Sequence, residues 1–129
     1  MVVNGNFMDF KFEYDGVPVT ILRGPYLVDE VPTSKAMALI AALTARLDEI
    51  RHYAARKGLL HLYNRFWLDE NCGPLDEESF VSKLTHPSLV LMDEFGAATI
   101  YFDDSDMFAG HWIEVFVYRG ELFSANIIG

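Results

Sequence analysis

The chain has 129 residues, of which 51% are hydrophobic and 14% are aromatic, and its formal net charge is −9. This length and composition predict one folded domain over residues 1–129 and exclude a disordered chain. The acidic balance disfavours a general nucleic-acid binder, because contacts from Lys and Arg to phosphate supply most non-specific affinity. No apolar run approaches the roughly 20 residues that span a bilayer.

The amino-terminal residues lack the basic and apolar regions of a secretory signal. The single cysteine, Cys72, excludes an internal disulfide framework and a cysteine-rich zinc site. We therefore expect a cytoplasmic protein. Neither a membrane association nor a cofactor is predicted.

Residues 7–14 and 17–22 alternate between apolar and polar side chains, which predicts two half-buried strands. The dipeptide Asp15-Gly16 between them is typical of a tight hairpin turn. Pro18 lacks a backbone donor, so we expect the second strand to lie at an edge, or to direct this position outward.

A long amphipathic helix is expected next, beginning at an N-cap formed by Thr33 or Ser34. Gly58 fits the position just after its carboxyl end. The apolar stripe of this helix recurs at steps of three and four residues. It consists of Ala36, Ile40, Leu43, Leu47, Ile50 and Ala54.

Two more helical segments are predicted before the chain returns to strands. Residues 59–68 are apolar on nearly every side, so we expect this segment to lie deep in the core. Asp76 is expected to cap a short helix at about 77–84, which Pro87 ends.

Four strands are expected in the last third of the chain. They cover residues 88–92, 98–104, 111–118 and 121–128. The element order is thus ββααα-ββββ. Strands and helices that are segregated in this way predict an α+β fold with antiparallel pairing, and we expect the helices to pack on one face.

Charge is unevenly distributed along the chain. Residues 69–106 contain ten carboxylates, opposed only by Lys83. Several of these acids lie at predicted strand ends: Asp93, Glu94, Asp103, Asp104 and Asp106. One interpretation is an acidic docking surface for a basic protein. The other is a set of solvated loops and a capped helix.

The densest polar cluster comprises Asp103, Asp104, Asp106, His111 and Glu114. Oxygen-rich clusters can bind Mg²⁺, Mn²⁺ or Ca²⁺. However, Phe108 occupies a position where an EF-hand loop beginning at Asp104 would need a ligand. His111 and Glu114 lie three apart on a predicted strand, so they point to opposite faces. A structural turn is the favoured interpretation, and no metal is predicted.

Signatures of catalysis such as G-x-S-x-G, H-E-x-x-H, G-x-G-x-x-G and the Walker loop do not occur in the sequence. We therefore do not predict an enzyme.

Four segments carry a resemblance to a known family: LLHLYNRFWLDE, LDEESFVSKL, FDDSDMFAGHWIEV and SANIIG. From about Asp9 to Gly129 the chain resembles the uncharacterised prokaryotic family named domain of unknown function 2262. The resemblance implies a small α+β bacterial protein. It implies no established activity and no catalytic residue.

By analogy with small acidic proteins encoded beside bacterial toxins, we expect a protein-binding module, most simply an immunity-type inhibitor that occludes the active site of a toxin. A basic toxin domain is the expected partner, and neither nucleic acid nor membrane is. The five strand-end acids would supply charge, and Tyr101, Trp112 and Tyr118 would be aromatic anchors. An adaptor or self-associating protein with an exposed edge strand is the alternative. A metal-dependent enzyme using the Asp103, Asp104, Asp106 and His111 cluster is a further one.

Overall fold

The structure, a computed structural model, describes residues 9–22, 27–28, 31–68, 73–92 and 97–128. The strands are β1 (Phe10–Tyr14), β2 (Val17–Ile21), β3 (Leu27–Val28), β4 (Val31–Pro32), β5 (Thr85–Leu91), β6 (Ala98–Asp103), β7 (Trp112–Tyr118) and β8 (Glu121–Ile128). The helices are α1 (Ser34–Thr44), α2 (Leu47–Ala54), α3 (Leu60–Phe66) and α4 (Glu77–Ser82), with a π-helical turn (Ala55–Leu59) between α2 and α3. The predicted α+β fold is confirmed.

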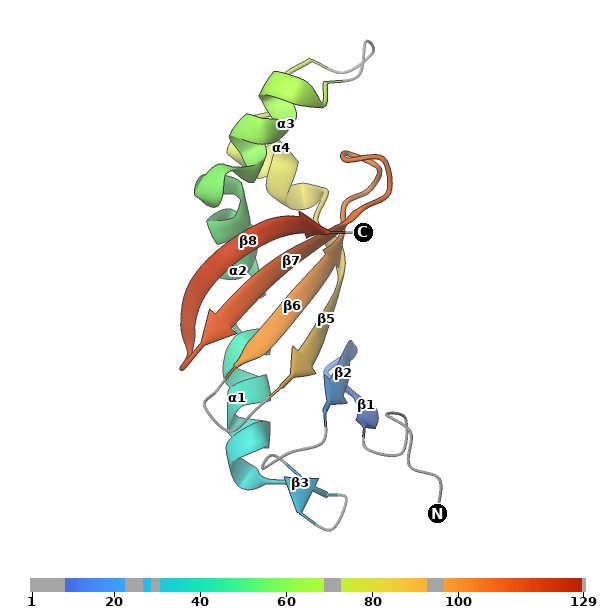
Figure 1. Cartoon of the computed structure of the whole chain (residues 1–129), viewed down its shortest axis with the longest axis vertical. Coiled ribbons are helices and arrows are strands. Elements are labelled where there is room, and N and C mark those ends of the chain that lie inside the picture. The colour runs from blue at the N-terminus through green and yellow to red at the C-terminus, as the bar shows by residue number, and fades with distance from the viewer. Residues whose placement is uncertain (1–8, 23–26, 29–30, 69–72, 93–96, 129) are drawn as a thin grey trace.

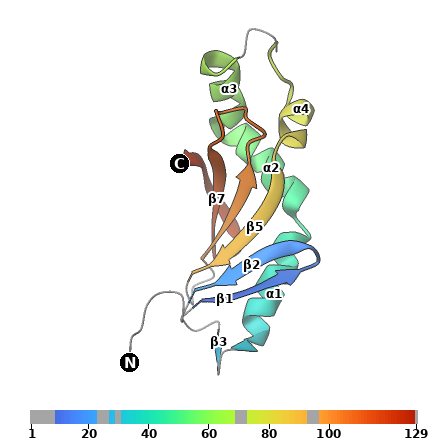
Figure 2. The ribbon, with the colours of Figure 1, turned by 90° about the vertical axis from the view of Figure 1, so that its right-hand side faces the viewer.

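Six strands form one mixed sheet in the order β1-β2-β5-β6-β7-β8, and β3 pairs with β4 separately. Helices α1 and α2 cover one face of this sheet, while α3 and α4 continue past one of its ends (Figure 1). The view turned by 90° shows the helices on one side of the strands (Figure 2). The opposite face carries no helix in the described part of the chain.

The Asp15-Gly16 turn joins β1 to β2 as predicted, with positive φ angles of 52° and 80°. The first two residues of the predicted strand 7–14 lie outside the described residues. A two-residue turn places Pro18 at a non-hydrogen-bonded position of the hairpin, so its missing donor points away from β1. Pairing with β5 begins only at Val19, and the proline therefore leaves no partner unsatisfied in either ladder.

The expectation of purely antiparallel pairing is wrong at one position. Strands β2 and β5 are parallel, with Val19 opposite Leu89 and Ile21 opposite Leu91. A parallel pair requires a long crossover, and the whole helical segment forms this crossover. The chain thus leaves β2, passes along one face of the sheet, and re-enters beside β2 in the same direction. Sequence periodicity does not specify which strands become neighbours.

The predicted long helix consists of two helices. Thr33 caps α1, since its side chain accepts a hydrogen bond from the Ala36 amide at 3.1 Å. The break follows Thr44, whose hydroxyl donates to the Ile40 carbonyl at 2.9 Å. Such back-bonding competes with the backbone ladder and bends helices. No helix in the described ranges has both the length and the hydropathy needed to cross a membrane.

The core lies between the sheet and these helices. Its side chains come from the predicted helical stripe and from every second residue of the central strands. Fully or almost fully buried members include Val19, Ile21, Ile40, Leu43, Ile50, Leu89, Leu91, Ile100, Phe102, Ile113, Val115 and Val117. Burial on this face leaves the alternate residues of the same strands on the other face.

Segment 59–68 does not lie deep in the core, contrary to expectation. Tyr63 is buried, but Phe66 is 68% exposed and Leu68 is 41% exposed. Helix α3 extends beyond the end of the sheet, so only one of its sides has a surface to pack against (Figure 1). The side chain of the polar Asn64 is hydrogen-bonded to both backbone groups of Leu75, at 2.9 Å each.

Candidate functional site

The outward side of β7 carries much of the exposed aromatic surface. Alternate residues of this strand are buried against the helices. The residues between them point away from the helices, and Trp112 and Tyr118 are 47% and 38% exposed. Glu114 and Phe116 lie between these two rings and are half-buried. The strand therefore presents aromatic rings on both sides of a carboxylate.

The neighbouring strands extend this surface in both directions. On β6, Tyr101 lies directly opposite Glu114, and Asp103 lies opposite Trp112. On β8, Ile128 lies on the other side of Trp112. Side chains directly opposite each other in a ladder have Cβ atoms about 5 Å apart, so these residues are neighbours on one face.

A bulge in β8 adds another exposed ring. The register between β7 and β8 shifts at Phe116, and Phe123 packs edge-on against Phe116 with ring centroids 5.9 Å apart. Phe123 is 64% exposed. At the same end, the Arg119 guanidinium lies 5.4 Å from the ring centre of Tyr118.

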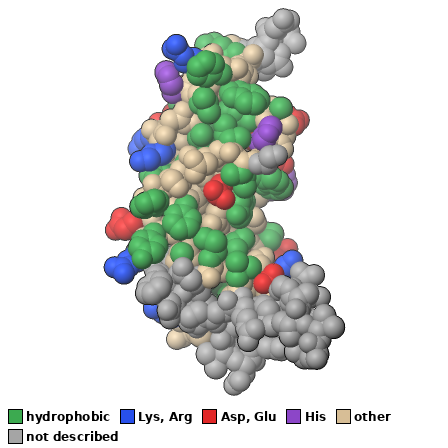
Figure 3. Space-filling view, in the orientation of Figure 1, with side chains coloured by type: hydrophobic (Ala, Val, Ile, Leu, Met, Phe, Trp, Pro, Cys, Tyr) green, Lys and Arg blue, Asp and Glu red, His purple; other side chains and the backbone are tan. Residues whose placement is uncertain are grey.

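We call this surface the open face, and define it by Tyr101, Asp103, Trp112, Glu114, Phe116, Tyr118, Phe123 and Ile128. Figure 3, which looks onto it, shows hydrophobic side chains gathered over the strands with few charged groups among them. A contiguous apolar patch on a folded protein commonly marks an interaction surface. The three aromatic anchors predicted from the sequence, Tyr101, Trp112 and Tyr118, lie together on this face.

A pocket of about 280 Å³ indents the open face. Ser88, Tyr101, Trp112 and Ile128 line it, so β5, β6, β7 and β8 each contribute one residue. Burial and the nearby Glu114 carboxylate raise the pKa of the Tyr101 phenol. This hydroxyl therefore stays protonated and can donate to Glu114.

The acidic residues predicted for partner binding do not form one surface. Asp103 lies on the open face, whereas Asp106 is exposed in the loop that follows β6. Asp104 is fully buried, so its assignment to a docking surface is wrong. Asp93 and Glu94 lie outside the described residues. Asp104 follows the inward-facing Phe102 by two residues, so the strand alternation already indicated the direction of its side chain.

The buried carboxylate of Asp104 holds the loop between β6 and β7. Its Oδ1 accepts a hydrogen bond from the Asp106 amide at 2.9 Å. Its Oδ2 accepts from the Phe108 amide at 2.8 Å and from the His111 amide at 3.1 Å. Three backbone donors that the strands leave unpaired are thus satisfied by one side chain.

This arrangement does not support the alternative metal cluster. Asp104 uses both oxygens on backbone amides, and the Nδ1 atom of His111 is hydrogen-bonded to the Phe108 carbonyl. Asp103 accepts from the Ser105 amide at 2.9 Å. The side chains of Asp103, Asp104 and His111 are therefore occupied within the loop, in agreement with the structural turn that the sequence favoured.

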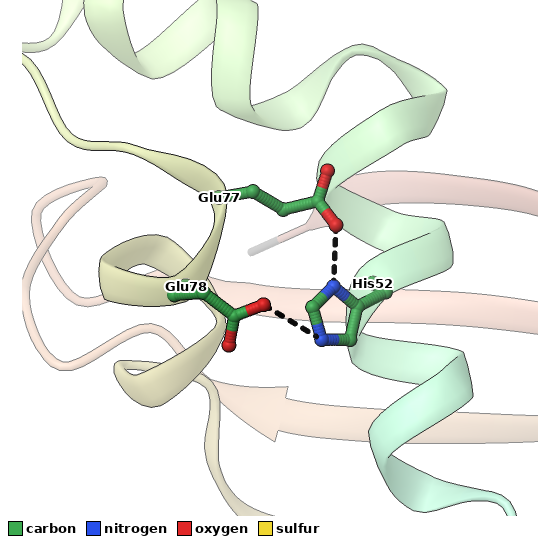
Figure 4. Close-up of side chains that lie close together, drawn as sticks. All are labelled: His52, Glu77 and Glu78. Atoms are coloured by element: carbon green, nitrogen blue, oxygen red, sulfur yellow. Dashed lines mark hydrogen bonds and ion pairs between the residues drawn. The ribbon is translucent and has the colours of Figure 1, made fainter.

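Within the described residues, acidic and histidine ligand atoms come together elsewhere, at His52, Glu77 and Glu78. His52 of α2 lies between the two glutamates of α4, with Glu77 at Nδ1 and Glu78 at Nε2, the latter 3.5 Å away (Figure 4). The two ring nitrogens are each already directed at a different glutamate. An ion-pair network explains this geometry better than a metal site.

Arg56 completes the network, since its Nη2 atom lies 2.9 Å from Glu77. The Arg56 guanidinium and then His52 lower the pKa of the Glu77 carboxyl. A hollow of about 420 Å³ beside the network is lined by residues that include Glu49 and Tyr53. Its charged groups are already paired, and the network's evident role is to fasten α4 to α2. His52 lies off the apolar stripe of the predicted helix, and only the tertiary structure shows its contact with α4.

Comparison with known protein families identifies the family of this chain. Residues 27–127 match a family model described as an uncharacterized protein conserved in bacteria (DUF2262). The chain belongs to this family. Neither the curated proteins nor the solved structures provide a match.

The DUF2262 match begins after the β1–β2 hairpin, so it is shorter than the resemblance from Asp9 that the sequence suggested. It contains the whole helical crossover and strands β5 to β7, together with nearly all of β8. All residues that define the open face, except Ile128, lie within the matched range.

Proposed function

We propose that this DUF2262 protein is a protein-binding module that uses its open face, and that it acts as an immunity-type inhibitor of a bacterial toxin. The observation that supports this is the exposure of Trp112, Tyr118 and Phe123 on one face of the sheet. Aromatic residues are typical anchors of protein interfaces. Such an inhibitor would act in the cytoplasm, the compartment predicted from the sequence.

The charge of the chain favours a basic partner. Asp103 and Glu114 lie among the aromatic residues of the open face, and the whole chain carries a net charge of −9. Toxins that act on nucleic acids need basic surfaces to bind phosphates. An acidic protein would be steered toward such a surface and would cover it with its aromatic residues.

The test uses the purified product of the gene adjacent to that of this chain. We expect a saturable complex in biolayer interferometry and a loss of toxin activity in its presence. A double variant, Trp112→Ala with Phe123→Ala, removes two exposed rings and should weaken the complex by about tenfold or more, as loss of interface anchors does.

The matched control is Phe66→Ala, which removes another highly exposed ring, at the end of α3. This variant should bind like the natural chain. Absence of a complex with the toxin would contradict the proposal. Equal affinities for the double variant and the natural chain would show that the open face is not the interface.

A second candidate function is self-association through an edge strand. Strand β8 lies at one end of the sheet, and its eight residues include neither proline nor lysine and only one charge, Glu121. Edge strands usually carry such protective residues. Light scattering over a range of concentrations distinguishes this candidate, because a chain that remains monomeric throughout is not a self-associating adaptor.

A further inference from the structure

The pocket on the open face combines aromatic walls with neighbouring negative charge. Trp112 and Tyr101 line it, and each of these rings has a carboxylate directly opposite it in the β6–β7 ladder. Asp103 pairs with Trp112, and Glu114 pairs with Tyr101. The volume of about 280 Å³ is just below the range of roughly 300–1,000 Å³ that is common for drug-sized ligands, and suits one large side chain.

Within the described residues, no lysine or arginine occupies the outward positions of β5 to β8 around the pocket. Besides the residues that line the pocket and the two carboxylates, these outward positions are Val90, Thr99, Phe116, Ser124 and Asn126. His86 lies 4.0 Å from Asp103 but is largely exposed. Arg119 is stacked on Tyr118, at the far end of β7. Asp103 accepts a hydrogen bond from the Ser105 amide and Glu114 lies beside the Tyr101 hydroxyl, but in the part of the chain that the structure describes no lysine or arginine is paired with either carboxylate.

We infer that this pocket binds an arginine side chain of the partner, an inference that rests on the proposed protein-binding function. A guanidinium is planar and weakly hydrated, so it stacks on an aromatic ring while its N–H groups donate to carboxylates. Trp112 is the strongest ring for such a contact. Asp103, opposite Trp112 in the β6–β7 ladder, and Glu114, opposite Tyr101, provide acceptors next to these two rings. An apolar side chain would fill the same pocket but would desolvate these two carboxylates without offering them a positive charge.

The probe is N-acetyl-arginine methylamide, and its neutral counterpart is the corresponding citrulline derivative, which has nearly the same shape. Binding is followed by the NMR signal of the Trp112 indole N–H, which is assigned with a Trp112→Phe variant. We expect a saturable shift with the arginine probe in the millimolar range and a much smaller one with citrulline. The Trp67 indole signal serves as an internal reference.

Charge variants identify the acceptors. Glu114→Gln and Asp103→Asn should each weaken binding of the arginine probe by about two- to five-fold, the usual range for a partly exposed ion pair. Glu121→Gln removes the same charge beside Tyr118, at the far end of the face, and should have no effect. Circular dichroism confirms that each variant is folded.

The inference is overturned if the citrulline probe shifts the Trp112 signal as strongly as the arginine probe, or if neither probe gives a saturable shift. These outcomes are separate from a failure of the proposed function. A partner could bind the natural chain and bind the Trp112→Ala and Phe123→Ala double variant more weakly, yet bind the Glu114→Gln variant as tightly as the natural chain. This result would support the interface and contradict the arginine anchor.

Discussion

Replacing Asp104 by asparagine should destabilise the protein far more than its place in an acidic loop suggests. The carboxylate is fully buried and accepts three backbone hydrogen bonds, from Asp106, Phe108 and His111. Asparagine keeps one carbonyl oxygen and replaces the other with an NH₂ group. At least one buried amide then loses its acceptor and faces a second donor.

The size of the effect follows from these contacts. A hydrogen bond to a charged acceptor contributes about 1.5–3 kcal/mol, and an orphaned buried donor costs about 1–3 kcal/mol. Because the asparagine side chain retains some of the bonds, we expect the free energy of unfolding to fall by about 2–4 kcal/mol. That loss is a large part of the roughly 5–15 kcal/mol by which small proteins are stable.

Urea unfolding at neutral pH measures this loss, and Asp106→Asn is the matched control. Asp106 is exposed and has a φ of 64°, a conformation that asparagine tolerates well. The control should lie within about 0.5 kcal/mol of the natural chain. Equal stabilities of the two variants would refute the role assigned to Asp104.

Two further predictions concern the helical layer. The pKa of Glu77 is lowered from 4.5 by Arg56 and His52, so its contribution to stability is present above that pH and is lost as the pH falls through the folded-state value. Glu77→Gln should therefore lower the urea midpoint at pH 7 but not in strong acid. A difference in midpoint between this variant and the natural chain that does not change with pH would contradict this. Gly58 has a φ of 118°, so Gly58→Ala should cost about 1–2 kcal/mol in urea unfolding. Gly73→Ala, in open space without a positive φ, should be nearly neutral, and equal effects of the two would refute the argument from backbone strain.

Local features of this chain were predictable because they depend on neighbours in sequence. The Asp15-Gly16 turn, the Thr33 and Asp76 caps and the alternation of β7 each follow from backbone geometry and side-chain chemistry within a few residues. The same alternation explains why Trp112 and Tyr118 were correctly expected as accessible aromatic residues. Applied to Asp103 and Asp104, it would also have shown that adjacent acids point to opposite faces.

The partners of each element depended on the tertiary structure. Strand pairing is specified by how the helical crossover returns the chain, and this alone made β2 and β5 parallel neighbours. The exposure of Phe66 depends on where the sheet ends beneath α3, which the composition of the helix does not encode. The pocket needs Ser88 and Ile128 from strands that are distant in sequence. The sequence by itself determined which side chains of a strand share a face, because side-chain direction along a strand is local. Only the fold determined which faces are exposed and which residues meet.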